Sequence, residues 1–193
     1  MENKEVVNYL LAHNDLKIIQ RKDMFNFSLD TVLLSQFCTI NKDVKNIVDF
    51  GTNNAAIPLL LSKRTPKKII GIEIQDEAVD LARRNVEMND LNDQIEIVHG
   101  DIKDVVKELP KAQLIVCNPP FFEVGENSNL NDKRLLYLNI CDSGHFGLKN
   151  GLLMESLSTQ LTHNSQAVVS NMWPISQSYS STFLMIFFLQ LKN

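Results

Sequence analysis

The segment of this chain best suited to chemistry is Asn118-Pro119-Pro120-Phe121, which directly follows an apolar run that we interpret as a buried strand. The prolines fix their backbone φ angles and donate no backbone hydrogen bond, so the Asn118 amide and the Pro119 carbonyl can both face one planar amino group. Phe121 can stack on that group. We therefore interpret the four residues as a site that binds an exocyclic amine.

The elements that position this segment alternate between strand and helix from Asn46 to Cys117. Apolar residues recur at helical spacing after Asp76, a residue able to cap a helix, and the runs between the helices have the length of strands. Such alternation predicts an α/β fold with a doubly wound, mostly parallel sheet. The predicted strands are 46–50, 68–73, 95–98 and 113–117, and the predicted helices are 55–62, one beginning near residue 76, and 102–109.

Residues 1–40 are predicted to form an N-terminal appendage of a core at 41–142. We expect a short helix at Tyr9-Leu10-Leu11, a short strand at Ile18-Ile19, and a second helix capped near Ser28 or Asp30. The residues of that second helix expected to face inward are Val32, Leu33 and Phe37.

The composition changes sharply in residues 143–193, whose charged residues are Lys149, Glu155 and Lys192. Serine and threonine are frequent there, and neither strand nor helix periodicity is evident. We expect this C-terminal part to be atypical or incomplete. One hypothesis is that it is a truncated or out-of-frame replacement of the last third of the domain, which reading the coding DNA in other frames would test.

Polar residues follow all four predicted strands of the core. Asp49 lies near the end of the first strand, and Gly51 and Asn53 lie in the turn after it, where an open α/β sheet places its ligand. Glu73 ends the second strand, at the distance along the chain where an acidic side chain accepts hydrogen bonds from ribose. Asp101 follows the third strand and can accept from an adenine amino group, while Asn118 follows the fourth. Together these positions suit a nucleoside-like ligand.

Composition and charge narrow the function classes. The formal net charge of -4 excludes a globally basic nucleic-acid binder, and 44% hydrophobic with 22% charged residues is typical of a globular protein. Three widely spaced cysteines suggest reduced thiols and a cytoplasmic location, and the histidines show no metal-binding spacing. No signal-peptide pattern or membrane-spanning run is evident, so we expect neither export nor a membrane partner.

The chain resembles the Rossmann-like S-adenosylmethionine-dependent methyltransferases, and within them the bacterial tRNA(Val) adenine-N6 methyltransferases. The resemblance extends from Tyr9 to about Asn131. The segments that carry it are Phe27-Ser28-Leu29-Asp30-Thr31-Val32-Leu33-Leu34, Asp49-Phe50-Gly51-Thr52-Asn53-Asn54, Ile57-Pro58-Leu59-Leu60-Leu61-Ser62, Gly71-Ile72-Glu73-Ile74 and Asn118-Pro119-Pro120-Phe121-Phe122.

The resemblance implies S-adenosylmethionine as the cofactor, an RNA substrate and no metal. It implies that Asp49, Gly51 and Asn53 hold the methionine part, that Glu73 holds the ribose and that Asp101 holds the adenine amine. It implies that Asn118, Pro119, Pro120 and Phe121 form the catalytic segment, with Asn118 bordering the cofactor as well. Members of the family commonly have glycine where this chain has Asn53 and Ala55.

The expected reaction is methylation of adenine N6 in tRNA. Hydrogen bonds from the N6 amine to the Asn118 amide oxygen and the Pro119 carbonyl would favour the pyramidal nitrogen needed for attack, and no base is required before attack. A flipped base would stack on Phe121 or Phe122, under a loop formed by residues 123–132.

Three alternatives remain open. A protein-glutamine N5-methyltransferase and a ribosomal-RNA guanine-N2 methyltransferase have similar Asn-Pro-Pro-aromatic sites. The third alternative, from another functional class, is a non-catalytic remnant whose cofactor binding is impaired by the substituted glycines and the atypical tail.

Overall fold

A computed structural model describes residues 4–11, 13–24, 26–118, 161–173 and 183–190, the last two ranges by their backbone alone. The strands are β1 (Glu5–Leu10), β2 (His13–Arg21), β3 (Asn46–Phe50), β4 (Lys68–Glu73), β5 (Ile95–His99), β6 (Ala112–Cys117), β7 (Leu161–Trp173) and β8 (Phe183–Gln190). The helices are α1 (Leu29–Phe37), α2 (Ala56–Ser62), α3 (Asp76–Met88) and α4 (Ile102–Val105).

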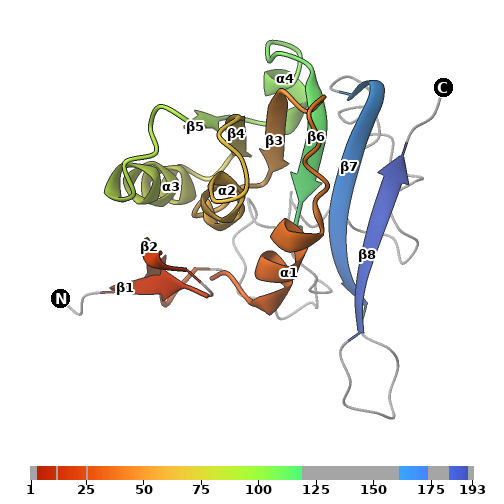
Figure 1. The fold of residues 1–193 in the computed structure, drawn as a ribbon. Helices are drawn as coiled ribbons and strands as arrows, with labels where there is room; N and C mark the ends of the chain where they lie inside the picture. Colours follow the sequence, from red (N-terminus) through yellow and green to blue (C-terminus); the bar gives the residue numbers. More distant parts are fainter. Residues whose placement is uncertain (1–3, 12, 25, 119–160, 174–182, 191–193) are drawn as a thin grey trace, which may run out of the picture.

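The central feature is a sheet of six strands in the order β5-β4-β3-β6-β7-β8 (Figure 1). Strands β5, β4, β3, β6 and β7 run parallel, and β8 is antiparallel to β7. The chain enters this sheet at β3, continues outward through β4 and β5, and then crosses to β6 on the other side of β3. This order confirms the predicted doubly wound, mostly parallel α/β fold.

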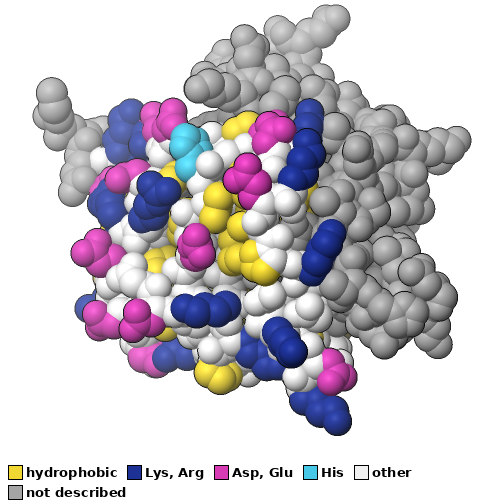
Figure 2. Space-filling model, turned by 90° about the horizontal axis from the view of Figure 1, so that it is seen from above, with side chains coloured by type: hydrophobic (Ala, Val, Ile, Leu, Met, Phe, Trp, Pro, Cys, Tyr) yellow, Lys and Arg dark blue, Asp and Glu magenta, His cyan; other side chains and the backbone are white. Residues whose placement is uncertain are grey.

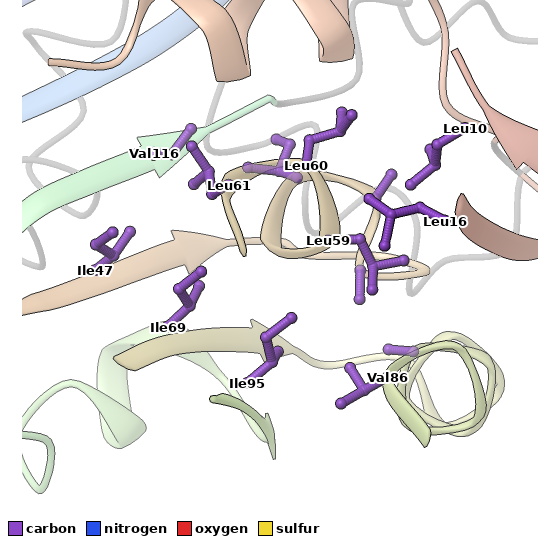
Figure 3. Close-up of a cluster of buried hydrophobic side chains, with 14 of the residues drawn as sticks. Leu10, Leu16, Ile47, Leu59, Leu60, Leu61, Ile69, Val86, Ile95 and Val116 are labelled. Carbon is purple, nitrogen blue, oxygen red and sulfur yellow. The ribbon is translucent and has the colours of Figure 1, made fainter. Parts of the chain in front are cut away.

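Two hydrophobic layers cover the sheet because alternate strand residues point to opposite faces. Ile47 packs in a cluster with α1, α2, α3 and the N-terminal strands, whereas Val48 and Phe50 pack in a second cluster with α4. Figure 3 shows the first cluster, in which Leu59, Leu60 and Leu61 of α2 lie between the sheet and the N-terminal strands.

The N-terminal region contains an antiparallel hairpin of β1 and β2, so the helix predicted at Tyr9-Leu10-Leu11 is wrong and the strand predicted at Ile18-Ile19 is confirmed. An apolar run this short has no decisive period. In β1, Val6, Val7 and Tyr9 are exposed and only Leu10 at the end of the strand reaches the core, so burial gives this segment no helical pattern either.

Helix α1 begins after Ser28, one of the two caps that the sequence predicts. Val32 is buried and Leu33 is partly buried, as expected, but Phe37 is 50% exposed, so its predicted inward orientation is wrong. Cys38, four residues after Leu34, takes the buried position next to the helix end.

Two further helix boundaries differ from those that the sequence predicts. Gln75, rather than Asp76, is the N-cap of α3. Helix α4 ends at Val105 instead of residue 109. Beyond Val106 the backbone N–H groups of Lys107 and Glu108 donate to carbonyls three residues earlier, so the segment continues as tight turns and not as α-helix.

The C-terminal part contributes two strands, β7 and β8, although the sequence shows no strand periodicity there. Strand β7 pairs with β6 over the same residues that lead to Asn118. The proposed truncated or out-of-frame origin of residues 143–193 and the division at residues 40 and 142 stay predictions. Among the described helices, none has the length and apolar character needed to cross a membrane.

Candidate active site at the carboxyl edge of the sheet

The register of the sheet brings the four predicted strand ends to one edge. Phe50 pairs with Ile72 and with Cys117, and Ile72 pairs in turn with Val98. The next residue of each strand or turn therefore lies at the same level of the sheet. Those residues are Gly51, Glu73, His99 and Asn118.

The turn after β3 has the backbone conformation usually associated with glycine, although only one of its residues is glycine. Gly51, Asn53 and Ala55 have φ angles of 70°, 50° and 65°. The backbone N–H groups of Gly51 and Thr52 each donate to the Ile72 carbonyl over 3.0 Å, which ties the turn to β4. The left-handed conformation costs a residue such as alanine about 1–2 kcal/mol, and the surrounding hydrogen bonds maintain it here.

Gly71 leaves the space that the turn needs. A Cβ atom at this position would lie 2.7 Å from the Thr52 hydroxyl oxygen and 2.8 Å from its methyl carbon. The absence of a side chain therefore lets Thr52 fold back over β4. Sequence analysis gave Gly71 no role, although a glycine inside an apolar strand signals such close approach.

Asp49 is a fully buried carboxylate at the end of β3, next to this turn. Within the described part of the chain, neither of its carboxylate oxygens has a hydrogen-bond partner. Burial raises the pKa of Asp49 to about 7, against a lowering contribution from the nearby Thr52 hydroxyl and with a smaller raising contribution from Glu73. An uncompensated buried carboxylate favours a cation in its neighbourhood.

Glu73 holds the turn from the adjacent strand. Its Oε2 atom accepts from the Asn53 backbone N–H over 2.9 Å, and Oε1 accepts from Ile74 and Gln75 over 2.8 and 2.9 Å. Burial raises the pKa of Glu73, while these three backbone hydrogen bonds oppose the rise. A carboxylate offers about four acceptor positions, so one position, on Oε2, can serve a ligand.

Asp101 follows β5 and caps α4. Its side chain accepts from the Lys103 backbone N–H over 2.9 Å. The residue is partly buried. One carboxylate oxygen thus stabilises the helix, while the second is suited to the predicted contact with an amino group.

Asn118 is held by α1, an arrangement that sequence analysis missed. Its Nδ2 atom donates to Asp30 Oδ2 over 3.0 Å and to Thr31 Oγ1 over 3.1 Å. Asp30 and Thr31 are each 5% exposed. The sequence predicted Asp30 only as a possible helix cap, because no local pattern indicates the distant residue that it contacts.

Asn85 of α3 is a second residue that sequence analysis missed. It is fully buried, accepts from the Ile19 backbone N–H over 2.6 Å, and donates to the Ile19 and Asn54 carbonyls over 3.2 and 2.9 Å. It thus joins β2 to the turn after β3. The sequence feature that could have indicated this role is an amide side chain on the apolar face of an amphipathic helix.

Several predicted residues lie outside the described residues: Pro119, Pro120, Phe121, Phe122 and the loop at 123–132.

Among the described residues, no group of three or more His, Cys, Asp or Glu side chains could hold a metal ion. On the face shown in Figure 2, acidic and basic side chains are interspersed around a hydrophobic area.

Comparison with known proteins assigns the chain to a family. The model of the methyltransferase small domain matches residues 24–137, which include α1, the turn after β3, Glu73, Asp101 and Asn118. The chain belongs to the methyltransferase small domain family.

Proteins similar in sequence include two named tRNA1(Val) (adenine(37)-N6)-methyltransferase. The one from Photobacterium profundum is 35% identical over 103 residues, covering 51% of this chain and 42% of the relative. The one from Flavobacterium psychrophilum is 30% identical over 129 residues, covering 65% of this chain and 55% of the relative. The chain thus spans about half the length of these curated relatives.

Solved structures confirm the Rossmann-like methyltransferase fold. A SAM-dependent methyltransferase from Agrobacterium tumefaciens has a TM-score of 0.62 at 12% identity, covering 91% of this chain and 55% of that chain. A precorrin-6y C5,15-methyltransferase from Geobacter metallireducens has a TM-score of 0.57 at 12% identity, covering 79% and 67%. At such identities the likeness concerns the fold alone.

Proposed function

We propose that this chain is an S-adenosylmethionine-dependent methyltransferase that acts on an exocyclic amino nitrogen of a nucleic-acid base, specifically adenine N6 in tRNA. The observation that carries the proposal is the position of the Asn118 amide, held by Asp30 and Thr31 at the same sheet edge as the turn after β3. The names of the sequence relatives support adenine N6 and tRNA.

The described residues fit the proposed cofactor. The turn presents backbone with three positive φ angles, which permits close approach of a ligand. The Asp49 carboxylate, which has no hydrogen-bond partner among the described residues, favours the cationic methionine part. The remaining position on Glu73 Oε2 suits a ribose hydroxyl, and Asp101 suits the adenine amine. When bound, S-adenosylmethionine supplies an electrophilic methyl group on a sulfonium.

Asn118 orients the acceptor of that methyl group. Its amide oxygen has two lone pairs and accepts a hydrogen bond from the target amine, which favours a pyramidal nitrogen with its lone pair directed at the methyl carbon. The proton leaves after attack, when the nitrogen has become cationic. This reaction needs alignment and electrostatic complementarity, and it uses no histidine or cysteine.

The sequence adds three residues to the proposal. The Pro119 carbonyl would be a second acceptor for the amine, Pro120 would keep the segment rigid, and Phe121 would stack on the base. A cytoplasmic location, expected from the reduced cysteines, likewise stays a prediction. Glutamine N5 and guanine N2 are the alternative acceptors, because each also presents a planar amino group to the same segment.

Calorimetric titration of S-adenosylmethionine into the purified chain tests the cofactor site. We expect saturable binding by wild-type protein and by Asn118→Ala, since Asn118 faces the acceptor, together with loss of methyl transfer in the variant. Equal loss of binding and transfer in Asn118→Ala would assign Asn118 a structural role. A folded wild-type chain without detectable binding would support the non-catalytic remnant instead.

A further inference from the structure

The contact between α1 and the end of β6 fixes which atom of the Asn118 amide faces the acceptor. The Asn118 Nδ2 group has two hydrogens, and it makes two hydrogen bonds, to Asp30 Oδ2 and to Thr31 Oγ1. Both partners are buried, so water does not compete readily for these bonds. The donor capacity of the amide is therefore used on the α1 side.

Asp30 decides the orientation of the amide because an ionised carboxylate only accepts hydrogen bonds. The Ser28 hydroxyl donates to the other oxygen of the same carboxylate. A flipped amide would place the Asn118 oxygen against Asp30, with two acceptors facing each other in a buried place. The observed orientation directs the amide oxygen away from α1.

The charge of Asp30 has a second consequence. A hydrogen bond to an ionised acceptor is about twice as strong as one between neutral groups. Donation from Nδ2 to a carboxylate also polarises the amide and makes its oxygen a better acceptor for the target amine. Asp30 thus acts on the amine through Asn118, from a position 88 residues earlier in the chain.

We propose that Asp30, assisted by Thr31, is a positioning residue that fixes the Asn118 amide with its oxygen toward the methyl-accepting amine. This inference rests on the proposed function, because it assigns Asn118 the acceptor site. It gives the Ser28-Leu29-Asp30-Thr31 segment a task beyond beginning a helix. The catalytic contacts remain those of Asn118.

Removing the charge of Asp30 provides the first kinetic test. Asp30→Asn keeps the size of the side chain, removes its charge and allows it to donate as well as accept hydrogen bonds. We therefore expect kcat to fall by about 100-fold, as for a misplaced reacting group. We expect the affinity for S-adenosylmethionine to stay within about twofold, because the side-chain hydrogen bonds of Asp30 within the described part of the chain go to Ser28 and Asn118 and not to the turn after β3.

The double variant separates positioning from a general need for Asp30. Asn118→Asp alone places two carboxylates together, whereas Asn118→Asp with Asp30→Asn restores one donor and one acceptor in reversed order. We expect the double variant to exceed Asn118→Asp in kcat by about tenfold, because coupled residues give non-additive effects. A double variant no more active than Asn118→Asp would overturn the proposal. Circular dichroism verifies that each variant is folded.

A measurement without turnover keeps the inference distinct from the proposed function. The side-chain NH2 signal of Asn118 in a 15N-labelled chain, assigned through its loss in Asn118→Asp, should exchange slowly with solvent and shift in Asp30→Asn. If wild-type protein lacks transfer but the signal responds in this way, the function fails and the positioning stands. An Asn118 signal unchanged in Asp30→Asn would refute the positioning whatever the activity.

Discussion

Replacing Asn85 by alanine should destabilise the fold more than any change to a partly exposed polar residue of α3. Asn85 is fully buried, and its side chain satisfies the Ile19 N–H, the Ile19 carbonyl and the Asn54 carbonyl. Truncation would leave these three backbone groups without that partner inside the protein. At about 1–1.5 kcal/mol for each of the three lost hydrogen bonds, the free energy of unfolding should fall by about 3–4.5 kcal/mol.

Asn89 provides a matched control one helical turn later. It makes the same two-sided contact with β2, accepting from the Lys17 N–H over 2.9 Å and donating to the Lys17 carbonyl over 2.7 Å. It also donates to the Asn85 carbonyl over 2.7 Å, but its site is partly exposed. Water can replace these bonds, so Asn89→Ala should cost about 1 kcal/mol or less. Asn85 lies inside α3 whereas Asn89 is its C-cap, so the gain in helix propensity on changing asparagine to alanine applies to Asn85 alone and reduces its expected loss by about 0.5 kcal/mol.

Urea denaturation followed by far-ultraviolet circular dichroism measures both variants. The account predicts a clearly lower midpoint for Asn85→Ala, with little change for Asn89→Ala and similar slopes. Equal losses in the two variants would refute the reasoning, since burial would then not determine the value of these contacts. A small loss in Asn85→Ala would mean that the turn after β3 does not depend on α3.

Three further predictions concern the turn and its neighbours. Asn53→Gly with Ala55→Gly should leave the affinity for S-adenosylmethionine within about threefold in calorimetry, because both residues already have positive φ angles. A much tighter affinity would show that the present turn is not adapted to the cofactor. Gly71→Ala should lower the free energy of unfolding by about 2 kcal/mol in urea, since its Cβ would lie 2.7 Å from the Thr52 hydroxyl oxygen. The pKa of Asp49 rises to about 7 on folding, so between about pH 4 and 7 the folded state retains a proton that the unfolded state loses. The free energy of unfolding should therefore fall as the pH rises through this range. Asp49→Asn should flatten this part of the stability profile, and an unchanged profile would contradict the burial of the Asp49 carboxyl group.

The core between Asn46 and Cys117 could be predicted from the sequence because each strand is a compact apolar run and the helices have clear periods or caps. The N-terminal hairpin could not, since the apolar run around Tyr9 is too short to distinguish strand from helix. Strand β7 was missed because polar residues interrupt any alternation in residues 161–173. Strand β8 was missed because its continuous apolar run has no period that distinguishes a strand from a buried helix.

The candidate site shows a similar division. Asp49, Glu73 and Asn118 could be placed at one edge because the carboxyl ends of parallel strands meet there. The contact between Asp30 and Asn118 joins residues far apart in sequence, so it depends on how α1 packs against the sheet, which no local pattern gives. The same holds for Asn85, whose partners lie on β2 and in the turn after β3.

The most direct test of the proposed function is the identity of the methylated nucleoside. The full chain would be incubated with methyl-labelled S-adenosylmethionine and unmodified tRNA, and the digested nucleosides would be separated by mass spectrometry, with Asn118→Ala as the inactive control. The account predicts label in N6-methyladenosine with the wild-type chain and none with the variant. Label in N2-methylguanosine, or no label from a folded chain that binds the cofactor, would contradict it.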